Sequence, residues 1–378
     1  MENSEKIIKV QGVFKHYDWG GKTFLPKLLQ RSNEEAKPYA EYWLGSNLHE
    51  PAGNLPYLFK VQDVEKMLSI QVHPTKEVAK KKFAEENERG IPLDAPNRNY
   101  KDENHKPELL SPLGDFYLLH GFRPADDLDK IIRDTPELNF LSDKFKSHDY
   151  RRLYTKVMTM SQEDVNQSLS PLLKRIIPLY NEGRLTKEQP DFWAARAALT
   201  FNKNGNIDRG IFSIYLFNIV HMKQGEALFQ DAGLPHAYLE GQTMEIMANS
   251  DNVLRGGLTP KHIDVPELLE HVVFEPTIPN VIRGTSEQTH EEVFVTPAED
   301  FQLSRIIIEP HLGIAIASLR SDIYFVYEGT GNVVADELNL SFRAGDALLV
   351  LPGTTAHFST EGRAILYRAT VPQSSGNN

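Results

Sequence analysis

The sequence contains no cysteine among its 378 residues. The chain therefore forms no disulfide, and a structural zinc site built from thiolates is excluded. Any metal that this chain binds must be held by histidine, carboxylate or amide side chains. Ligand sets of that kind suit a catalytic metal better than a structural one.

Long apolar runs and excess positive charge are also missing. The longest apolar stretch, residues 211–220, is interrupted by Ser213 and Asn218 and is too short to cross a bilayer. The formal net charge of -11 argues against an extended nucleic-acid surface. The segment before Gly12 has no apolar signal core. These features predict a cytoplasmic enzyme or binding protein that contacts neither membrane nor nucleic acid, and a monomer is the default expectation.

Two common catalytic motifs are incomplete. Gly-Lys-Thr at residues 21–23 matches the end of a phosphate-binding loop, but His16 stands where that loop needs its first glycine. His49-Glu50 and His290-Glu291 lack the second histidine of the zinc-protease pattern. The sequence therefore favours neither a nucleotide-binding loop nor a zinc hydrolase of that class.

Hydrophobic periodicity divides the chain into a β-rich part, a helical block and a second β-rich part. The helical block is expected to contain helices at residues 125–133, 150–160, 161–169, 171–180 and 190–201. Ser170 is predicted to cap a new helix that begins with Pro171. A further helix is expected at residues 75–89, with Thr75 as its N-cap. The chain is mostly β again from about residue 221, apart from a short helix from Val265.

One short segment has a strictly alternating pattern. At residues 68–74, Ser69, Gln71 and His73 are predicted to share one face of a strand, and Ile70 and Val72 the other. An amide oxygen and an imidazole side by side on a strand make half of a metal site. A strand with an ordinary solvated face has the same pattern, so this segment alone does not establish one.

Two other segments contain dense polar residues. If residues 106–110 are extended, Lys106 and Glu108 share a face, either as a surface ion pair or as a metal ligand beside a cation. His236 lies in a Gly-Leu-Pro-His segment, and the apolar run that follows it is threaded with Glu245, Asn249, Asp251, Arg255 and Lys261. Two histidines, one glutamate and one glutamine on three segments make a plausible nitrogen and oxygen site for zinc.

Taken together, these motifs resemble the signatures of the type I mannose-6-phosphate isomerase (phosphomannose isomerase) family of the cupin superfamily. The matching segments are residues 69–74, 104–108, 233–238 and 250–261. The resemblance implies a mainly β fold: a cupin-type jelly-roll catalytic domain, a helical domain inserted into it, and a second jelly roll without metal. The corresponding expected boundaries are residues 1–123 with 221–291, residues 124–220, and residues 292–378. His357 is then a structural residue of the last domain.

The resemblance also implies roles for individual residues. One zinc ion per chain is expected on four ligands: Gln71, His73, Glu108 and His236. The family's catalytic arginine corresponds to Arg255. Positions that line the sugar-phosphate pocket correspond to Trp19, Ser69, Lys106, Glu245 and Lys261. Positions around the reacting end of the sugar correspond to His105, Tyr238 and Asp251.

The implied reaction interconverts mannose 6-phosphate and fructose 6-phosphate through a cis-enediol, which would feed mannose metabolism. Such a reaction needs a base that works near neutral pH. Glu245 and Asp251 are the carboxylate candidates, with His105 or Lys106 as partner, and the sequence does not rank them. Ser69, Lys106 and Lys261 suit the phosphate, and Arg255 could bind it instead of acting in the chemistry.

Two other classes of protein are alternatives to this interpretation. A sugar-phosphate-binding jelly roll without turnover would have no need of an intact ligand set and Arg255. A cupin oxygenase that binds iron prefers histidines or a facial triad, which Gln71 does not fit. One segment departs from the family pattern, because residues 46–49 differ from the sequence that usually follows the Glu-Xaa-Trp-Xaa-Gly motif. The family pattern therefore does not specify the wall of the pocket near Trp43.

Overall fold

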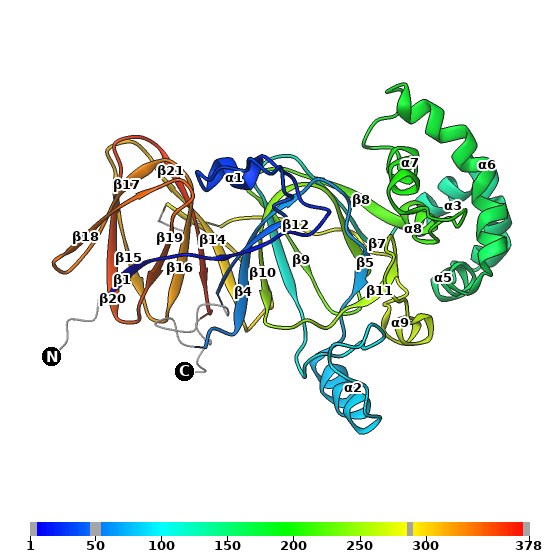
Figure 1. Cartoon of the computed structure of the whole chain (residues 1–378), viewed down its shortest axis with the longest axis horizontal. Coiled ribbons are helices and arrows are strands. Elements are labelled where there is room, and N and C mark those ends of the chain that lie inside the picture. Colours follow the sequence, from blue (N-terminus) through cyan, green and yellow to red (C-terminus); the bar gives the residue numbers. More distant parts are fainter. Residues whose placement is uncertain (1–5, 46–53, 286–289, 373–378) are drawn as a thin grey trace.

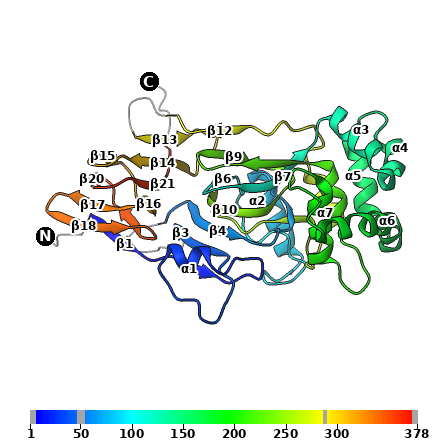
Figure 2. The same ribbon diagram turned by 90° about the horizontal axis from the view of Figure 1, so that it is seen from above.

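Two β structures lie end to end, and most helices gather at the far end of the larger one (Figure 1). The computed structural model describes residues 6–45, 54–285 and 290–372. Residues 46–49, where the family pattern is interrupted, therefore lie outside the described part. Figure 2 shows the same order from above, with the larger β structure between the smaller one and the helices.

The larger β structure is one extensively branched antiparallel sheet. Its backbone order is β12-β9-β6-β10-β4-β3-β2, and β5, β7, β8 and β11 join near the start of β10. The strands are β2 (Val13–Lys15), β3 (Glu41–Gly45), β4 (Tyr57–Val64), β5 (Ile70–Val72), β6 (Glu108–Pro112), β7 (Phe116–Phe122), β8 (Phe217–Met222), β9 (Glu226–Gln230), β10 (His236–Ala248), β11 (Leu254–Gly257) and β12 (Val281–Arg283).

Strand β10 is the element that connects the parts of this sheet. Near its start, His236 pairs with β5 and β7, and from residue 241 onward the strand pairs with β4 and β6. A single extended segment therefore carries His236 at one end and Glu245 near the other. The register of β10 shifts between Tyr238 and Glu240, and this irregularity lets His236 and Glu245, nine residues apart, face the same barrel interior although strict alternation would put them on opposite faces.

The helices are α1 (Phe24–Leu28), α2 (Lys76–Glu88), α3 (Ala125–Asp134), the 3-10 helix η1 (Pro136–Leu141), α4 (Ser142–Phe145), α5 (Tyr150–Thr159), α6 (Gln162–Asn181), α7 (Pro190–Phe201), α8 (Gly210–Leu216) and α9 (Val265–His271). All except α1 and α2 gather at the end of the larger sheet where β5, β7 and β8 lie (Figure 1). Within the described ranges, none of these helices is both long and apolar enough to cross a membrane. The expected helix after Thr75 is confirmed, and Thr75 accepts a hydrogen bond from the backbone N–H of Val78.

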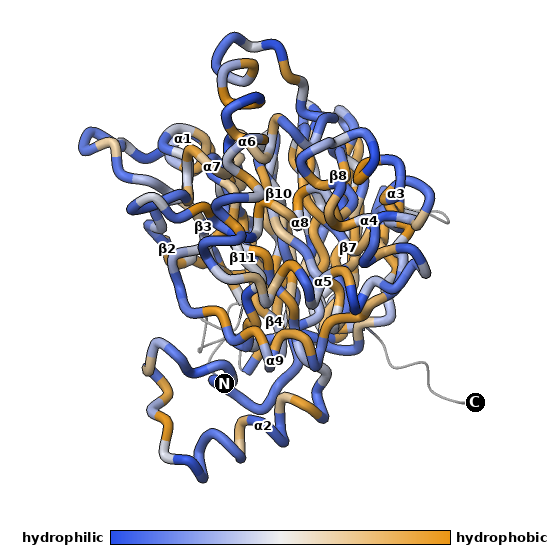
Figure 3. The backbone as a smooth tube through the Cα atoms, turned by 90° about the vertical axis from the view of Figure 1, so that its right-hand side faces the viewer, coloured by the Kyte–Doolittle hydropathy of each residue, from blue (hydrophilic) through white to orange (hydrophobic). Residues whose placement is uncertain are grey.

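The largest core joins the helices to strand β5. Ile70 and Val72 are fully buried in it, together with Leu153, Trp193 and Phe212 from the helical block. Figure 3 shows the hydrophobic residues concentrated in the strands and in the helix faces against them, with hydrophilic loops outside. The apolar face predicted for the alternating segment is therefore confirmed. Its polar face, on the opposite side, points into the barrel.

The predicted helix boundary at Ser170 is wrong. Helix α6 runs through both expected helices, at 161–169 and 171–180, with Pro171 inside it. Ser170 does not cap a helix, because its hydroxyl donates to the backbone carbonyl of Asn166 at 2.6 Å. The buried face continues across the proline, and its packing offsets the backbone hydrogen bond that Pro171 cannot donate. That face consists of Val165, Leu169, Leu172, Leu173 and Ile176.

The smaller β structure is a sandwich of a six-stranded and a four-stranded sheet, with orders β1-β19-β16-β21-β14-β13 and β15-β20-β17-β18. Its strands are β1 (Ile7–Val10), β13 (Glu291–Phe294), β14 (Gln302–Ile308), β15 (Gly313–Ser318), β16 (Asp322–Glu328), β17 (Thr330–Ala335), β18 (Leu338–Arg343), β19 (Ala347–Val350), β20 (Thr354–Ser359) and β21 (Ala364–Thr370). Strand β1, from the start of the chain, pairs with β19. The sequence analysis did not predict this pairing. The side chain of His357 is exposed on β20, so it takes no part in the core of the sandwich.

A partly buried acidic contact attaches α2 and the loop after it to α9. The Glu267 carboxylate accepts hydrogen bonds from Lys82 at 3.0 Å, from the Tyr100 hydroxyl at 2.6 Å and from His271 at 3.0 Å. Burial opposes ionisation of this carboxyl, but these hydrogen bonds dominate and lower the pKa of Glu267 to about 2. Glu267 therefore remains ionised far below the pH at which a solvated glutamate is protonated.

We expect Glu267→Gln to make the protein less stable in a pH-dependent way. The folded-state pKa is below the unfolded value of about 4.3, so the carboxylate stabilises the fold above about pH 4.3, and this contribution is lost as the pH falls towards 2. The variant should lose about 1–3 kcal/mol of unfolding free energy at pH 7, and the difference should shrink below pH 4. Urea denaturation at several pH values measures this. Glu270→Gln, at an exposed partner of the same Lys82, is the control and should change little; equal effects of the two variants would contradict the prediction.

Candidate active site

One row of paired residues crosses three neighbouring strands of the barrel. Arg255 on β11 is the register partner of Gln71 on β5, and Gln71 is the partner of His236 on β10. Register partners on adjacent antiparallel strands direct their side chains to the same face. The pairing therefore brings the guanidinium, the amide and the imidazole to one side of the sheet, although they are far apart in the sequence.

A cluster of two histidines and one glutamate lies beside this row. The Nε2 atoms of His73 and His236 lie 3.2 and 3.4 Å from the two oxygens of the Glu108 carboxylate. One potential ligand atom from each of the three residues lies within 4.8 Å of the others, and all three side chains are buried. Lys106 Nζ lies 3.1 Å from Glu108 Oε1, so the predicted common face of Lys106 and Glu108 is confirmed.

The hydrogen bonds of the two imidazoles fit a metal site. His73 Nδ1–H donates to the backbone carbonyl of Asn252 at 2.9 Å, and His236 Nδ1–H donates to that of Leu234 at 2.9 Å. These bonds place the proton of each neutral ring on Nδ1 and leave Nε2 as the free lone pair. In the described part of the chain, the buried Nε2 atom of His73 has no hydrogen-bond partner. A buried acceptor in this position is expected to have a ligand.

Electrostatics of the cluster also favour metal binding. Burial and the neighbouring Lys106 lower the pKa of His73 to about 4, so the ring is neutral at neutral pH. Burial opposes ionisation of Glu108, but Lys106 and the imidazoles hold the pKa of that carboxyl well below its usual range. The two imidazoles and one carboxylate, with the Gln71 amide on the adjacent strand, form a donor set that zinc accepts.

A second buried polar cluster faces the first across the barrel. Lys60 Nζ lies 2.8 Å from Glu245 Oε2 and 3.8 Å from Glu41 Oε1, and the Tyr238 hydroxyl donates to Glu245 Oε1 at 2.7 Å. Burial disfavours the charge of Lys60, but the two carboxylates raise its pKa. Burial raises the pKa of Glu245, and the charge of Glu108 adds to this effect. A carboxyl with a raised pKa binds a proton more readily than a solvated one, which suits a general base.

These clusters line one continuous recess of the protein. A cavity of about 80 Å³ touches both of them, with Gln71, Glu108, His236, Tyr238 and Glu245 in its wall. A wider cavity of about 770 Å³ adjoins it and shares Glu41, Lys60, Gln71 and Lys106. Its wall also includes the predicted residues Trp19, Ser69, Asp251, Arg255 and Lys261. The structure therefore brings together most of the residues that the sequence singled out.

Two predicted residues have other surroundings. His105 pairs with Asp300 of the second β structure, with Nε2 and Oδ2 2.7 Å apart, and it is not among the described residues that line either cavity. Asp251 does line the wide cavity, but its side chain is exposed. Among the two carboxylate candidates, Glu245 is the one that is buried and coupled to a cation.

Lys60, Gln62 and Glu41 belong to the site but were not among the residues predicted from the sequence. A usable signal was present, because β4 alternates apolar and polar residues, and this alternation puts Lys60 and Gln62 on the face opposite Phe59 and Val61. A strand with all eight residues buried cannot have a solvated face. Charged side chains in such a strand must therefore have buried partners.

The loop after Arg255 is held from the helical block by one carboxylate. Asp208 Oδ1 accepts the backbone N–H of Gly210 at 2.7 Å and that of Leu258 at 2.8 Å, and Oδ2 accepts that of Thr259 at 3.1 Å. Leu258 has a φ of 54°, a conformation that costs free energy for a residue with a side chain. The bonds to Asp208 offset that cost and fix the loop between β11 and Lys261.

Proteins of known function are similar to this chain in sequence and in fold. The family model described as "Phosphomannose isomerase type I, catalytic domain" matches residues 48–125. The mannose-6-phosphate isomerase of Salmonella typhimurium is 32% identical over 375 residues, covering 89% of this chain and 92% of the relative. Mannose-6-phosphate isomerase 2 of Arabidopsis thaliana is 28% identical and covers 98% and 95%. A crystal structure of the Salmonella enzyme bound to its substrate and to zinc has a TM-score of 0.85 and 30% identity, covering 97% of this chain and all of that one.

A jelly-roll barrel with a buried His–Glu–His cluster beside a small cavity, which adjoins a wide one lined by cations, defines a metalloenzyme of the cupin class. The identity and coverage of the relatives are specific beyond that class. The chain belongs to the type I phosphomannose isomerase family.

Proposed function

We propose that this protein catalyses the reversible isomerisation of mannose 6-phosphate and fructose 6-phosphate with one zinc ion. The observation that carries the proposal is the buried cluster of His73, Glu108 and His236, two of which line the small cavity that adjoins the wide, cation-lined one. Membership of the family supplies the substrate and the reaction. An iron-dependent oxygenase is disfavoured, because Gln71 joins the site through the strand register.

Gln71, His73, Glu108 and His236 would hold the zinc. When bound, the ion supplies a Lewis acid that polarises the carbonyl oxygen of the sugar. Each imidazole is oriented by its Nδ1 hydrogen bond to a backbone carbonyl, which prevents rotation of the ring. Lys106 keeps Glu108 ionised and lies where it can also approach the substrate.

Arg255 and Glu245 are proposed to act on the reacting carbons. Arg255 is half-buried at the cavity wall, and its permanent positive charge would stabilise the negative charge that develops on the enediolate. Glu245 is the favoured base, because its pKa is raised and its hydrogen bond to Tyr238 fixes its orientation. Lys60, 2.8 Å from Glu245, would balance the charge of the carboxylate as the proton moves between C1 and C2.

The phosphate end of the substrate is proposed to bind Ser69 and Lys261, with Trp19 beside the sugar. All three line the wide cavity, and Trp19 is stacked on Tyr17 with ring centroids 5.9 Å apart. Burial and the nearby Arg255 lower the pKa of Lys261, which indicates a locally positive environment. An anionic ligand would relieve that repulsion.

The three-part organisation is proposed as the sequence analysis gave it, with residues 1–123 and 221–291 forming the catalytic domain. A monomer in the cytoplasm remains part of the same proposal. The pairing of β1 with β19 ties the first strand of the chain to the C-terminal sandwich. The catalytic domain would therefore be covalently continuous with both of its neighbours and in contact with them.

A coupled assay for conversion of mannose 6-phosphate to fructose 6-phosphate tests the function. The protein is stripped of metal with a chelator and assayed before and after zinc is added. We expect no turnover in the stripped protein and recovery with zinc, because a catalytic metal site needs its ion. His236→Ala should lose both bound zinc, measured by elemental analysis, and activity.

His221→Ala provides a matched control for the loss of a histidine. His221, on β8, pairs with Asp115 away from the cluster, so this variant should keep zinc and activity. A wild-type protein that binds zinc and the sugar phosphate without turnover would favour a binding protein. Absence of zinc uptake would overturn the proposed metal site.

A further inference from the structure

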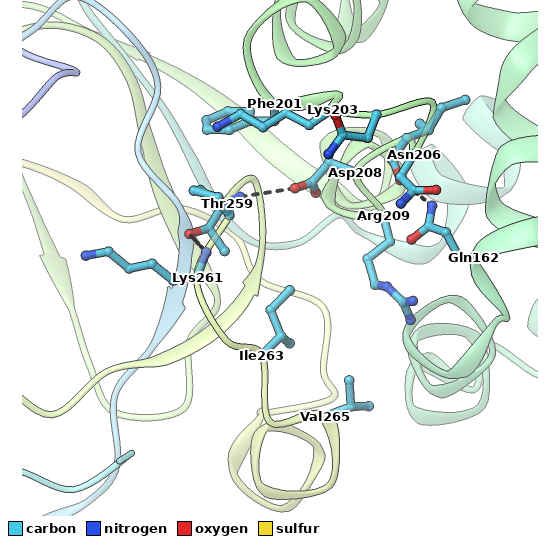
Figure 4. Close-up of a pocket in the computed structure, with 13 residues that line it drawn as sticks. Gln162, Phe201, Lys203, Asn206, Asp208, Arg209, Thr259, Lys261, Ile263 and Val265 are labelled. Carbon is cyan, nitrogen blue, oxygen red and sulfur yellow. Dashed lines mark hydrogen bonds between the residues drawn. The ribbon is translucent and has the colours of Figure 1, made fainter. Parts of the chain in front are cut away.

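The helical block contributes part of the wall of the substrate cavity. Thr200 and Phe201, at the end of α7, and Lys203, just after it, line the wide cavity together with Lys261. Lys203 and Lys261 also border a second cavity of about 490 Å³ on the other side of the loop that carries Lys261 (Figure 4). In that view both lysine side chains extend towards the same side, away from the second cavity.

Lys203 is placed by a tight turn. Its backbone N–H donates to the carbonyl of Asn206 at 3.1 Å, and the N–H of Asn206 donates back at 2.9 Å. Asn204 and Gly205, between them, have φ angles of 54° and 78°. Asn-Gly is the preferred pair for a two-residue turn with both central residues left-handed, so this sequence is suited to the conformation it adopts.

Side chains of α6 hold this turn against the helical block. Asn166 donates to the carbonyl of Gly205 at 3.1 Å and accepts the backbone N–H of Ile207 at 2.9 Å. Gln162 donates to the carbonyl of Ile207 at 2.9 Å. The backbone from which Lys203 projects is therefore fixed by three side-chain hydrogen bonds, so less freedom is lost when the lysine binds a ligand.

The end of α7 is attached to the barrel as well. Arg196 bonds both to Glu240 on β10 and to the backbone carbonyl of Glu65, and Lys187 also pairs with Glu240. Arg196 lies less than two turns of helix before the end of α7, and Lys203 follows after a short connection. The contacts of Arg196 and Lys187 fix the position of α7 relative to the cavity in which the substrate would bind.

Lys203 has no acidic partner among the described residues, and it shares this property with Arg255 and Lys261 in the same cavity wall, whereas nearby cations of the helical block are paired. Lys187 and Arg196 pair with Glu240, and Arg175 pairs with Glu137. Within the part of the chain that the structure describes, no carboxylate lies within ion-pair distance of Lys203. In a protein with a net charge of -11, an unpaired lysine facing a cavity beside a second cation is a site for an anion.

We propose that Lys203 binds the phosphate group of the substrate together with Lys261, so that the helical block makes the enzyme selective for phosphorylated hexoses. The proposal rests on the proposed isomerase function and extends its substrate site to a residue outside the barrel. A phosphate monoester carries about -1.5 to -2 charge at pH 7, and two lysines in the wall of one cavity match that charge. An unphosphorylated sugar gains nothing from either cation.

The test compares Lys203→Met with the zinc-loaded wild type. We expect the KM for mannose 6-phosphate to rise about tenfold, which corresponds to about 1.4 kcal/mol, with kcat within about twofold. Lys203→Arg keeps the charge and should remain close to the wild type. Lys174→Met, at an exposed position on α6, is the matched control and should leave both constants unchanged.

Calorimetric binding of mannose 6-phosphate and of inorganic phosphate separates this proposal from the function itself. Weaker binding of both ligands to Lys203→Met, with unchanged binding to Lys174→Met, supports the phosphate contact. Equal dissociation constants for Lys203→Met and wild type would overturn it, even if the wild type is an active isomerase. If the wild type shows no turnover, the proposed function fails, and inorganic phosphate still tests Lys203 by the same comparison.

Discussion

Replacing Lys60 with methionine is expected to lower the free energy of unfolding by about 3–5 kcal/mol, because a buried ion pair would lose one partner. Lys60 is 6% exposed, and Glu245 and Glu41 are 2% and 5% exposed. Without the ammonium group, two carboxylates would remain buried side by side with no cation between them. Methionine has a similar volume and no charge, so the loss reports the ion pair and not a cavity. Urea denaturation at pH 7 measures the change.

A second substitution makes this prediction specific. Lys60→Met combined with Glu245→Gln removes one of the orphaned charges, so the double variant should recover part of the loss. Lys66→Met, at an exposed position of the same cavity mouth, should change stability by less than about 0.5 kcal/mol. A loss below about 1 kcal/mol for Lys60→Met, or no recovery in the double variant, would show that the pair does not stabilise the fold.

Replacing Arg255 with glutamine is expected to reduce kcat/KM for mannose 6-phosphate by about 10²–10³-fold, mostly through kcat. The residue lies in the same strand row as Gln71 and His236, so its cation faces the end of the cavity where the sugar carbonyl would lie. Glutamine keeps hydrogen-bonding capacity and removes the charge, which isolates the electrostatic contribution. Steady-state kinetics of the zinc-loaded variant measure the effect.

The same experiment decides between the two roles that the sequence left open for Arg255. An arginine that only binds phosphate would raise KM and leave kcat near the wild-type value. Lys261→Met, at the proposed phosphate position, supplies the reference for that pattern. A similar profile for both variants would place Arg255 at the phosphate and contradict its proposed role at the reacting carbons.

The metal cluster was accessible from the sequence because its residues lie in short, regular segments. The alternation at residues 68–74 and the spacing of Lys106 and Glu108 predict faces of strands, and the structure confirms both. Only the resemblance to a family predicted that those faces converge, because no local sequence pattern indicates which strands pair. The register of β11, β5 and β10 supplies that information.

Features that depend on distant packing were not accessible in this way. Pro171 is a local stop signal for a helix, but the buried face on both sides of it keeps α6 continuous. The pairing of β1 with β19 joins residues more than three hundred positions apart, and a four-residue strand contains no indication of its partner. Lys203 was missed because a lysine in an Asn-Gly turn is indistinguishable in sequence from one on any solvated loop.

The three backbone hydrogen bonds accepted by Asp208 make the helical block and the substrate loop a single cooperative unit. Two of them end on Leu258 and Thr259, and the third ends on the first residue of α8. Local unfolding of the helical block therefore releases the loop that carries Lys261, and an ordered loop in turn stabilises the block. Substitutions deep in the helical core will consequently change substrate affinity without touching any residue of the cavity, and a shortened enzyme lacking the block will lose its substrate loop along with it.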